Sequence, residues 1–269
     1  MSRVGCQGCR DGERLPFSFT MAFHPIVDAE SNKIWGYEAL VRGTEGQGAG
    51  DILAQVDEAN RYKFDQACRV KAIELAGSLF SDRATRLSIN FMPNAVYEPA
   101  ACIRATLEAA HRVGFPHEQI MFEFTENERM VDVAHVRRIV AEYRKQGFLT
   151  ALDDFGAGYA GLNLLANLQP DLIKLDMELI RGIANSPARQ TIIACVTTMA
   201  RQLGVTVLAE GVETEAELSA LRSAGIRLFQ GYLFAKPAIE RLPDVRFPGL
   251  DDLSGETGSG SVTVSSKAA

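Results

Sequence analysis

The chain alternates between short apolar runs and longer segments with helical periodicity. Short apolar runs bounded by turn residues are typical of buried strands, whereas apolar residues three and four apart are typical of amphipathic helices. The pattern predicts strands at residues 19–27, 34–42, 87–92, 120–125, 149–154, 171–176, 205–210 and 227–231. It predicts helices at residues 51–80, with a break near 62–63, and at residues 100–113, 131–146, 162–168, 177–183, 188–203 and 215–224.

The order of these elements predicts the fold class. From residue 87 onward strands and helices alternate, which indicates a parallel sheet covered by helices. The first two strands are too close in sequence for a parallel crossover, so we expect them to pair antiparallel. About eight strands in a chain of this length are typical of a TIM-like (β/α)8 barrel, with an antiparallel first strand here. A doubly wound open sheet is the alternative.

Composition limits the environment of the protein. The 269 residues are 46% hydrophobic and 23% charged, which is ordinary for a globular protein. The net charge of -6 argues against binding to a long nucleic acid. No apolar segment is long enough to cross a bilayer and none near the start reads as a secretory signal, so we expect a cytoplasmic location without membrane insertion.

The ends of the chain differ in composition from its centre. We expect residues 1–18 to be a loose lead-in, residues 19–250 to form the barrel domain, and the Gly/Ser-rich residues 251–269 to be a disordered tail. Five scattered cysteines do not suggest a disulfide framework. Cys6 and Cys9 form a CxxC pair without visible partners, and a redox or zinc role for this pair stays open.

Polar residues recur where the predicted strands end. The segment Asp153-Asp154-Phe155-Gly156 places two carboxylates at the end of an apolar run, just before a glycine-containing loop. Because the carboxyl ends of barrel strands meet on one face, where active sites are built, we expect the strand-end residues to form one site. These residues are Glu38, Arg42, Asn90, Glu123, Asp153, Asp154, Lys174, Glu210 and Gln230.

The residue types in this set favour divalent metal chemistry. Carboxylate and amide oxygens suit Mg²⁺ or Mn²⁺, and so many acids in one place suggest two ions. Paired metals are typical of in-line displacement at phosphorus. In such a site Asp153 could bridge the ions while Asp154 serves one, Lys174 could orient the attacking water, and Arg42 could bind a phosphate. No G-x-S-x-G elbow or Walker loop occurs, and the single histidine near the strand ends, His24, argues against a zinc hydrolase.

The motifs together resemble the EAL family of cyclic di-GMP phosphodiesterases. The string Glu38-Ala39-Leu40-Val41-Arg42 carries the family signature, and further matches follow in the family's order over roughly residues 20–240. They are Ser88-Ile89-Asn90, Glu123-Phe124-Thr125-Glu126, Asp153-Asp154-Phe155-Gly156, Lys174-Leu175-Asp176, Glu210-Gly211-Val212-Glu213 and Phe229-Gln230-Gly231-Tyr232. The resemblance implies hydrolysis of cyclic di-GMP to linear pGpG with two Mg²⁺ or Mn²⁺ ions.

The resemblance also implies individual roles. One metal would be held by Glu38, Asn90, Glu123 and Asp153, and the second by Asp153, Asp154 and Glu210. Lys174 would bind the nucleophilic water, and Glu210 would act as a base. Substrate contacts would come from Leu40, Arg42, Asp176 and Gln230. Glu126 and Glu213 would position the loop at residues 155–164, which in the family lies near a homodimer interface.

Three points stay open at this stage. His24 stands where the family commonly has glutamine, and it is either an altered substrate contact or a hydrogen-bonded structural histidine. Met92 stands where the family often has serine. Family members usually carry a sensor or GGDEF domain, so this chain is either a stand-alone enzyme, for which a sensor in trans is one option, or a fragment of a longer protein. A receptor that binds cyclic di-GMP without cleaving it, a partner-regulated interaction module and an unrelated Mg²⁺-dependent barrel lyase are the competing functions.

Overall fold

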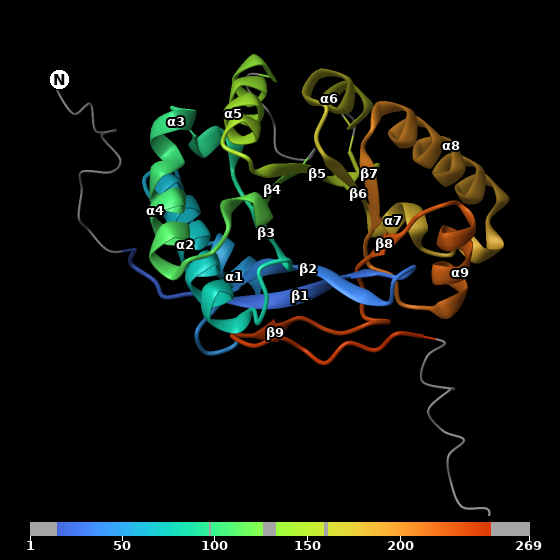
Figure 1. The fold of residues 1–269 in the computed structure, drawn as a ribbon, viewed down its shortest axis with the longest axis horizontal. Coiled ribbons are helices and arrows are strands. Elements are labelled where there is room, and N and C mark those ends of the chain that lie inside the picture. The colour runs from blue at the N-terminus through green and yellow to red at the C-terminus, as the bar shows by residue number, and fades with distance from the viewer. Residues whose placement is uncertain (1–14, 97, 126–132, 159–160, 249–269) are drawn as a thin grey trace, which may run out of the picture.

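The computed structural model describes residues 15–96, 98–125, 133–158 and 161–248. Its sheet has the order β2-β3-β4-β5-β6-β7-β8-β1, and it closes because β1 also pairs with β2 (Figure 1). The barrel strands are β1 (Thr20–Asp28), β2 (Lys33–Arg42), β3 (Arg86–Asn90), β4 (Ile120–Thr125), β5 (Leu149–Phe155), β6 (Leu172–Leu175), β7 (Thr206–Ala209) and β8 (Leu228–Phe229). The expected TIM-like barrel is confirmed, and the open sheet is excluded by this closure.

Strand β1 runs against both of its barrel neighbours. It pairs antiparallel with β2 and with β8, whereas the pairs from β2–β3 to β7–β8 are parallel. The short strand β9 (Ala238–Ile239) adds a second antiparallel contact to β1 at Ala22 and Phe23. In Figure 1 the C-terminal segment that contains β9 runs beneath β1, on the side of the barrel where no helix is drawn. The antiparallel first strand predicted from the short connection is therefore confirmed.

Helices surround the remaining strands (Figure 1). Their bounds are α1 (Ala49–Leu53), α2 (Arg61–Leu79), α3 (Pro99–Cys102), α4 (Arg104–Val113), α5 (Val133–Lys145), α6 (Gly161–Leu168), α7 (Met177–Ile180), α8 (Pro187–Leu203) and α9 (Glu215–Ser223). Short 3-10 turns lie at η2 (Pro93–Ala95), η3 (His117–Gln119) and η4 (Ile183–Asn185). Among the helices of the described residues, none combines the length and apolar character needed to cross a bilayer.

Two helix predictions need correction. The break in the predicted helix at residues 51–80 lies between α1 and α2, before Arg61, not near residues 62–63. There the Asp57 carboxylate accepts hydrogen bonds from the backbone amides of Ala59 and Asn60, and the Asn60 side chain accepts one from the Asp57 amide. Such local bonds compete with the helical ladder. The predicted helix at 100–113 is likewise divided, with Ile103 between α3 and α4.

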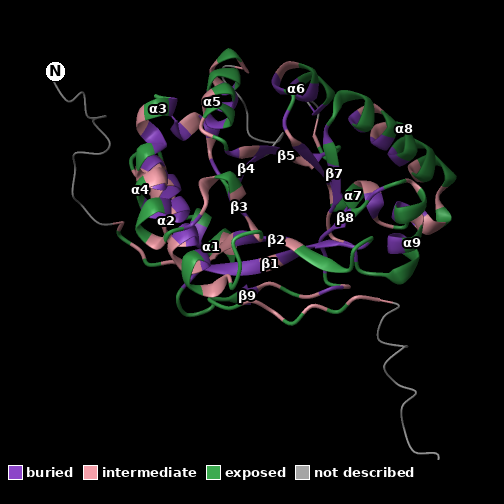
Figure 2. Ribbon diagram, in the orientation of Figure 1, coloured by how far each residue is buried: buried purple, intermediate pink, exposed green. Residues whose placement is uncertain are grey.

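Two apolar layers hold the barrel together, and Figure 2 shows the buried residues concentrated on the strands and on the helix faces toward them. The outer layer lies between strands and helices. The inner layer fills the barrel itself and consists of Ile26, Met121, Ala151, Leu172, Leu208 and Leu228. Because alternate residues of a strand share a face, the residue two positions beyond each inner-layer residue also points into the barrel. The inner layer therefore forms a floor, and the next inward position of each strand lies above it.

An ion pair closes the seam between β1 and β8. The Asp28 carboxylate accepts hydrogen bonds from Nε and Nη2 of Arg227 at 2.9 and 2.6 Å. It also accepts bonds from the backbone amides of Glu30 and Ser31 in the β1–β2 turn. Burial acts to raise the pKa of Asp28, but Arg227 and the turn amides outweigh it and lower the pKa to about 2.

We expect Asp28→Asn to destabilise the protein by about 1 kcal/mol at pH 7, after allowance for solvent screening of an ion pair that is open on the arginine side. Because the pKa of Asp28 is lower in the folded protein than in the unfolded chain, the carboxylate stabilises the fold at pH values above the unfolded pKa of 3.8. This stabilisation is lost as the pH falls from 3.8 toward 2. Urea unfolding of both proteins at pH 7 and near pH 3 measures the effect. A destabilisation of equal size at both pH values would contradict the charge-based explanation, and Glu58→Gln on the surface is the control.

Candidate active site

The inner faces of the strands carry polar residues directly above the apolar floor. Met121, Ala151, Leu172, Leu208 and Leu228 are followed two positions later by Glu123, Asp153, Lys174, Glu210 and Gln230, respectively. Strand β1 runs the opposite way, so its mouth residue His24 comes two positions before Ile26 and pairs across with Glu38. The structure thus brings the predicted strand-end residues together at the C-terminal mouth of the barrel.

Lys174 lies at the centre of this group. Its side chain is 1% exposed, and its Nζ atom is 2.6 Å from Glu210 Oε1 and 2.7 Å from Glu123 Oε2. The same nitrogen is 3.1 Å from Asp153 Oδ1 and 3.6 Å from Glu38 Oε1. One ammonium group therefore contacts carboxylates from four different strands or strand ends. We call Glu38, Glu123, Asp153, Asp154, Lys174 and Glu210 the acidic cluster.

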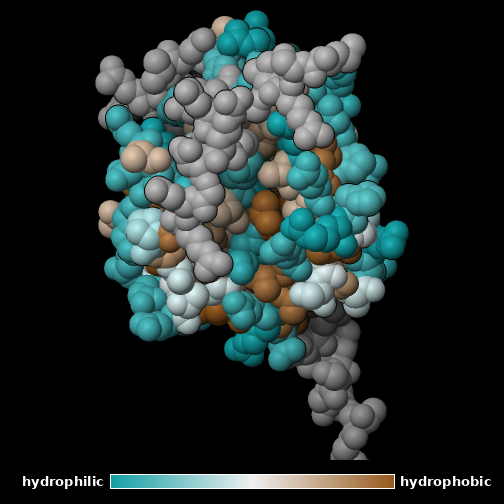
Figure 3. Space-filling model, turned by 90° about the vertical axis from the view of Figure 1, so that its left-hand side faces the viewer, coloured by the Kyte–Doolittle hydropathy of each residue, from teal (hydrophilic) through white to brown (hydrophobic). Residues whose placement is uncertain are grey.

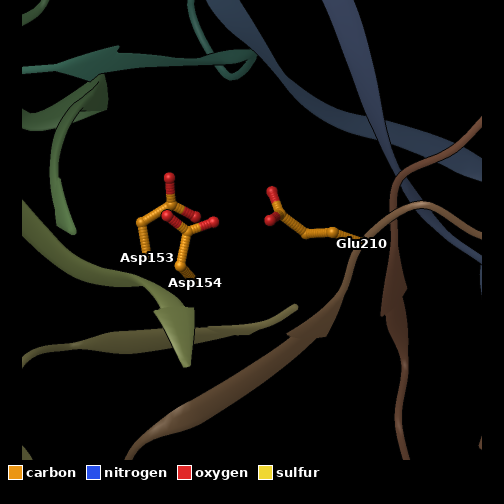
Figure 4. Close-up of side chains that lie close together, drawn as sticks. All are labelled: Asp153, Asp154 and Glu210. Carbon is orange, nitrogen blue, oxygen red and sulfur yellow. The ribbon is translucent and has the colours of Figure 1, made fainter. Parts of the chain in front are cut away.

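A local irregularity in β5 turns both of its carboxylates toward the mouth. Consecutive strand residues normally face opposite sides of a sheet. Here the register with β6 shifts between Leu152 and Phe155, and Asp154 adopts a left-handed φ of 54°. As a result carboxylate oxygens of Asp153, Asp154 and Glu210 all lie within 4.8 Å of one another. In Figure 4 the three side chains point into the same space between the ends of β5 and β7.

Amide and hydroxyl donors fix the orientation of two acids. Asn90 Nδ2 donates to Glu38 Oε1 at 2.8 Å, and Gln230 Nε2 donates to Glu38 Oε2 at 3.0 Å. Ser88 Oγ donates to Glu123 Oε1 inside the barrel. Gln230 is only 2% exposed, and the hydrogen bond to Glu38 is the contact observed for its side chain. The sequence did not single out Ser88 as a donor, although its position two residues before Asn90 on the same strand face was the available signal.

The electrostatics of the cluster follow from burial and crowding. Burial raises the pKa of Glu123 and of Glu210 well above the ordinary value despite the lowering effect of Lys174. Burial would also raise the pKa of Glu38, but Lys174, His24 and the two amide donors together lower it. For Lys174 burial acts to lower the pKa, and the four carboxylates outweigh it and raise the pKa well above the usual range. Lys174 is therefore charged at neutral pH.

The donor set fits divalent cations. The cluster contains five carboxylates and one ammonium group, so it holds more negative charge than Lys174 can offset. Hard oxygen donors at this density are what Mg²⁺ and Mn²⁺ prefer, and Asn90 adds a neutral amide beside Glu38. Asp153, Asp154 and Glu210 have oxygens close enough to share one ion. The geometry is suited to charge neutralisation by added cations at the barrel mouth.

A cavity of about 480 Å³ is lined in part by Asn90, whose side chain donates to Glu38 of the acidic cluster. We call it the α2 cavity; its wall includes Leu40, Leu53, Arg61, Phe64, Asn90 and Met92, from the ends of β2 and β3 and from α1 and α2. The wall is mainly apolar, and it shares Asn90 with the polar mouth. Figure 3, which looks at the side covered by α2, α3 and α4, shows apolar side chains reaching the surface between polar ones.

The other predicted contact residues have structural partners. Arg42 lies at the end of β2, on the same strand face as Glu38 and Leu40, and its Nη1 donates to the Val41 carbonyl at 2.7 Å. Asp176 caps helix α7 by accepting a hydrogen bond from the Glu178 amide at 2.8 Å. These contacts leave the predicted roles in substrate binding untested, so they stay predictions.

The predicted loop residues are only partly described. The Glu213 carboxylate accepts a hydrogen bond from Arg181 Nη2 at 2.9 Å, so its observed partner lies after α7. Glu126 lies outside the described residues, as do positions 159–160 of the loop at 155–164. Cys6 and Cys9 also lie outside them, together with most of the predicted lead-in and the tail. The domain limits therefore stay predictions.

His24 is hydrogen-bonded in the structure. Its Nε2 donates to the Ala235 carbonyl at 3.1 Å, and its ring lies 6.0 Å from the ring of Tyr232 between centroids. Burial lowers the pKa of His24, which favours the neutral ring. The sequence left two interpretations of His24, an altered substrate contact or a hydrogen-bonded structural histidine, and the bond to Ala235 agrees with the second. It leaves a contact with substrate untested.

The closed barrel and its acidic mouth define a TIM-like α/β protein with a candidate metal site. The chain belongs to the EAL domain family, whose profile matches residues 17–237. Two curated relatives illustrate the range of the family. The blue light- and temperature-regulated antirepressor BluF of Escherichia coli is 35% identical over 228 residues, which cover 84% of this chain and 56% of BluF. A cyclic di-GMP phosphodiesterase of Pseudomonas aeruginosa is 30% identical over 234 residues, covering 84% of this chain and 40% of that protein.

Solved structures share the fold. A standalone versatile EAL protein from Vibrio cholerae, in its c-di-GMP bound form, has a TM-score of 0.83 and 54% identity over 87% of this chain and 98% of that one. BlrP1 of Klebsiella pneumoniae, in a manganese and cyclic di-GMP complex, has a TM-score of 0.80 and 36% identity over 87% of this chain and 59% of that one. The chain spans about half the length of the two curated relatives, so the activities of those whole proteins do not transfer to it directly.

Proposed function

We propose that the protein is a phosphodiesterase that hydrolyses cyclic di-GMP to linear pGpG with two Mg²⁺ or Mn²⁺ ions. The observation that carries this proposal is the acidic cluster, in which four carboxylates contact Lys174 at the mouth of the barrel and Asp154 adds a fifth beside Asp153 and Glu210. Its support is the EAL family membership and the cyclic di-GMP and manganese found with related proteins. The cytoplasmic location predicted from the sequence fits an enzyme that acts on a signalling nucleotide.

In this proposal Glu38, Asn90, Glu123 and Asp153 would hold one ion, and Asp153, Asp154 and Glu210 would hold the other. When bound, the ions supply Lewis acid stabilisation of the charge that develops on the scissile phosphate. In the hydrolysis, the oxygen of a water forms a bond to phosphorus, the bond from phosphorus to the ribose 3′ oxygen breaks, and the leaving oxygen takes a proton.

The side chains of the cluster have distinct tasks in this reaction. Lys174, fixed by its carboxylate contacts, orients the attacking water, and Glu210 accepts its proton. Asn90 and Gln230 hold the Glu38 carboxylate in place by their hydrogen bonds, so its oxygens keep a fixed direction toward a cation. Leu40, Arg42 and Asp176 lie around the mouth as the proposed substrate contacts.

Turnover of cyclic di-GMP by the purified protein tests the function. We expect pGpG, read by chromatography, in the presence of Mg²⁺ or Mn²⁺, and no product when EDTA removes the metal, because the substrate phosphates and the carboxylates repel each other without it. Tight binding of cyclic di-GMP without pGpG in either metal would contradict the enzyme and favour a receptor.

A receptor or partner-regulated module is the second candidate. The observation that favours it is the 35% identity with BluF, which is described as an antirepressor. A homodimer formed through residues 155–164 and a sensor acting in trans belong to either candidate. Within that segment Leu162 is 65% exposed, which is compatible with an interface. Light scattering with and without cyclic di-GMP tests the dimer.

A further inference from the structure

A buried carboxylate on helix α2 holds the chain just beyond the end of strand β3. Asp65 Oδ1 accepts a hydrogen bond from the backbone amide of Met92 at 2.9 Å. The parallel ladder between β2 and β3 ends with the pair Ala39 and Ile89, and an amide beyond it needs another acceptor. The Asp65 side chain, which is 1% exposed, provides that acceptor from a helix on the outside of the barrel.

The Asp65 carboxylate is itself fixed by a buried ion pair. Asp65 Oδ2 lies 2.6 Å from Nη2 of Arg69, one turn later in α2, and Arg69 is fully buried. Arg69 Nη1 also donates to Tyr143 Oη on α5 at 3.4 Å. Apolar residues of similar volume often stabilise a fold as well as a buried ion pair does, so stability alone does not explain this pair. The pair does aim Asp65 Oδ1 at a single backbone amide.

The anchored amide lies two residues beyond Asn90, a residue of the candidate site. Asn90 Nδ2 donates to Glu38 Oε1 at 2.8 Å. On the other side of this strand end, the amide of Phe91 donates to the Glu123 carbonyl at 2.9 Å. Two bonds therefore hold the backbone directly after Asn90, one to strand β4 and one to helix α2. With both bonds made, the Asn90 side chain keeps its direction toward Glu38.

We propose that Asp65 is a positioning residue of the metal site, because by accepting the Met92 amide it fixes the end of β3 and so directs Asn90. Asp65 acts through the backbone and contacts neither the ions nor the substrate. The inference rests on the proposed function, in which Asn90 is a ligand of one ion. It goes beyond that function by tracing the support of this ligand to an acid on helix α2.

Two double variants separate the acceptor from the ion pair. Asp65→Ala alone would leave the Arg69 cation buried and unpaired, which is strongly destabilising. Asp65→Asn/Arg69→Met, the acceptor-keeping variant, removes both charges but retains a side-chain oxygen for the Met92 amide. Asp65→Leu/Arg69→Met, the acceptor-free variant, removes both charges and the acceptor, and leucine has nearly the shape of asparagine. Neither variant changes the net charge or leaves a buried ion alone, so we expect both to fold.

The control is the double variant Glu74→Gln/Arg112→Met. It removes another ion pair of helix α2, in which Arg112 Nη2 on α4 lies 2.6 Å from Glu74 Oε1. This pair is on the surface, and the two changes together also leave the net charge unaltered.

Binding of Mn²⁺ in the absence of substrate, measured by isothermal titration, is the first readout. We expect the acceptor-free variant to bind one of its two ions roughly 10- to 100-fold more weakly than the unmodified protein, since losing the outer support of a metal ligand has effects of this size. The acceptor-keeping variant and the control should bind Mn²⁺ within about threefold of the unmodified protein. Amide hydrogen exchange at Met92 should be faster in the acceptor-free variant alone, and thermal unfolding checks that every variant is folded.

Removal of Asn90 tests the route of the effect. In an Asn90→Ala background the two Asp65 variants should bind Mn²⁺ equally, because the ligand that Asp65 supports is absent. Turnover of cyclic di-GMP is the second readout. In the acceptor-free variant kcat should fall at limiting Mn²⁺ and recover at saturating Mn²⁺, with an unchanged KM for cyclic di-GMP.

Two outcomes would overturn the inference. Equal Mn²⁺ affinity of the two Asp65 variants, whether normal or weakened, would mean that the acceptor oxygen does not matter. A difference between them that persists in the Asn90→Ala background would mean that the effect does not pass through Asn90. Either outcome, with pGpG formed by the unmodified protein, leaves the proposed function intact.

The proposed function can also fail separately. If the unmodified protein binds Mn²⁺ but forms no pGpG, the enzyme is rejected, and the Mn²⁺ affinities of the two Asp65 variants still decide the role of Asp65. If the unmodified protein binds no Mn²⁺, both proposals fail.

Discussion

Glu38→Ala should reduce the turnover of cyclic di-GMP on the order of a thousandfold or more and weaken metal binding while the fold survives. Glu38 receives hydrogen bonds from both Asn90 and Gln230 and lies 3.6 Å from Lys174 Nζ, so its removal takes a fixed anionic ligand from the centre of the site. Initial rates over a range of Mn²⁺ concentrations measure both effects, and circular dichroism checks the fold.

The matched control for Glu38→Ala is Glu58→Ala. Glu58 is an exposed acid in the connection between α1 and α2, so its removal changes the net charge equally without entering the mouth of the barrel. We expect this control to keep its full rate. A Glu38→Ala protein that turns over cyclic di-GMP within about tenfold of the unmodified rate would refute the assignment of Glu38 to a metal.

Lys174→Met should lower kcat by orders of magnitude and leave the affinity for cyclic di-GMP nearly unchanged, because the lysine acts on the attacking water in the proposed reaction. A second effect follows from its contacts with four carboxylates. Without the ammonium group these acids repel one another more strongly. Mn²⁺ should therefore raise the Tm of Lys174→Met by more than it raises the Tm of the unmodified protein.

These two readouts separate a catalytic role of Lys174 from a purely structural one. Lys145→Met, on the exposed end of α5, is the control for loss of one positive charge. A rate of Lys174→Met within twofold of the unmodified rate would remove the lysine from the mechanism, whatever happens to the Tm. An unchanged rate with a larger metal-induced rise in Tm would mean that Lys174 only balances charge.

Most of the fold could be predicted from the sequence because strand and helix periodicities are local properties. Each predicted barrel strand overlaps an observed one, from β1 to β8. The errors concern two helices, one interrupted between α1 and α2 and one divided at Ile103. In the connection between α1 and α2 the side chains of Asp57 and Asn60 bond to nearby backbone amides and compete with helical hydrogen bonds, which apolar periodicity does not record.

The candidate site was predictable for a related reason. In a parallel barrel the carboxyl ends of all strands meet, so polar residues at the ends of apolar strands must gather. Glu123, Asp153, Lys174 and Glu210 were found in this way, and each follows a floor residue of the inner layer by two positions. Ser88 was missed as a candidate, since it is an ordinary strand serine.

The sequence by itself determined the barrel, its antiparallel first strand and the set of acids at its mouth, because each depends on spacing along the chain. Only the tertiary structure decided how those acids are arranged. The bulge in β5 and the left-handed backbone of Asp154 turn two neighbouring carboxylates the same way, against the ordinary alternation of a strand. The packing of separate strands brings Lys174 into contact with four acids and directs Gln230 toward Glu38. Such contacts join residues far apart in sequence, so their geometry appears only when the barrel closes.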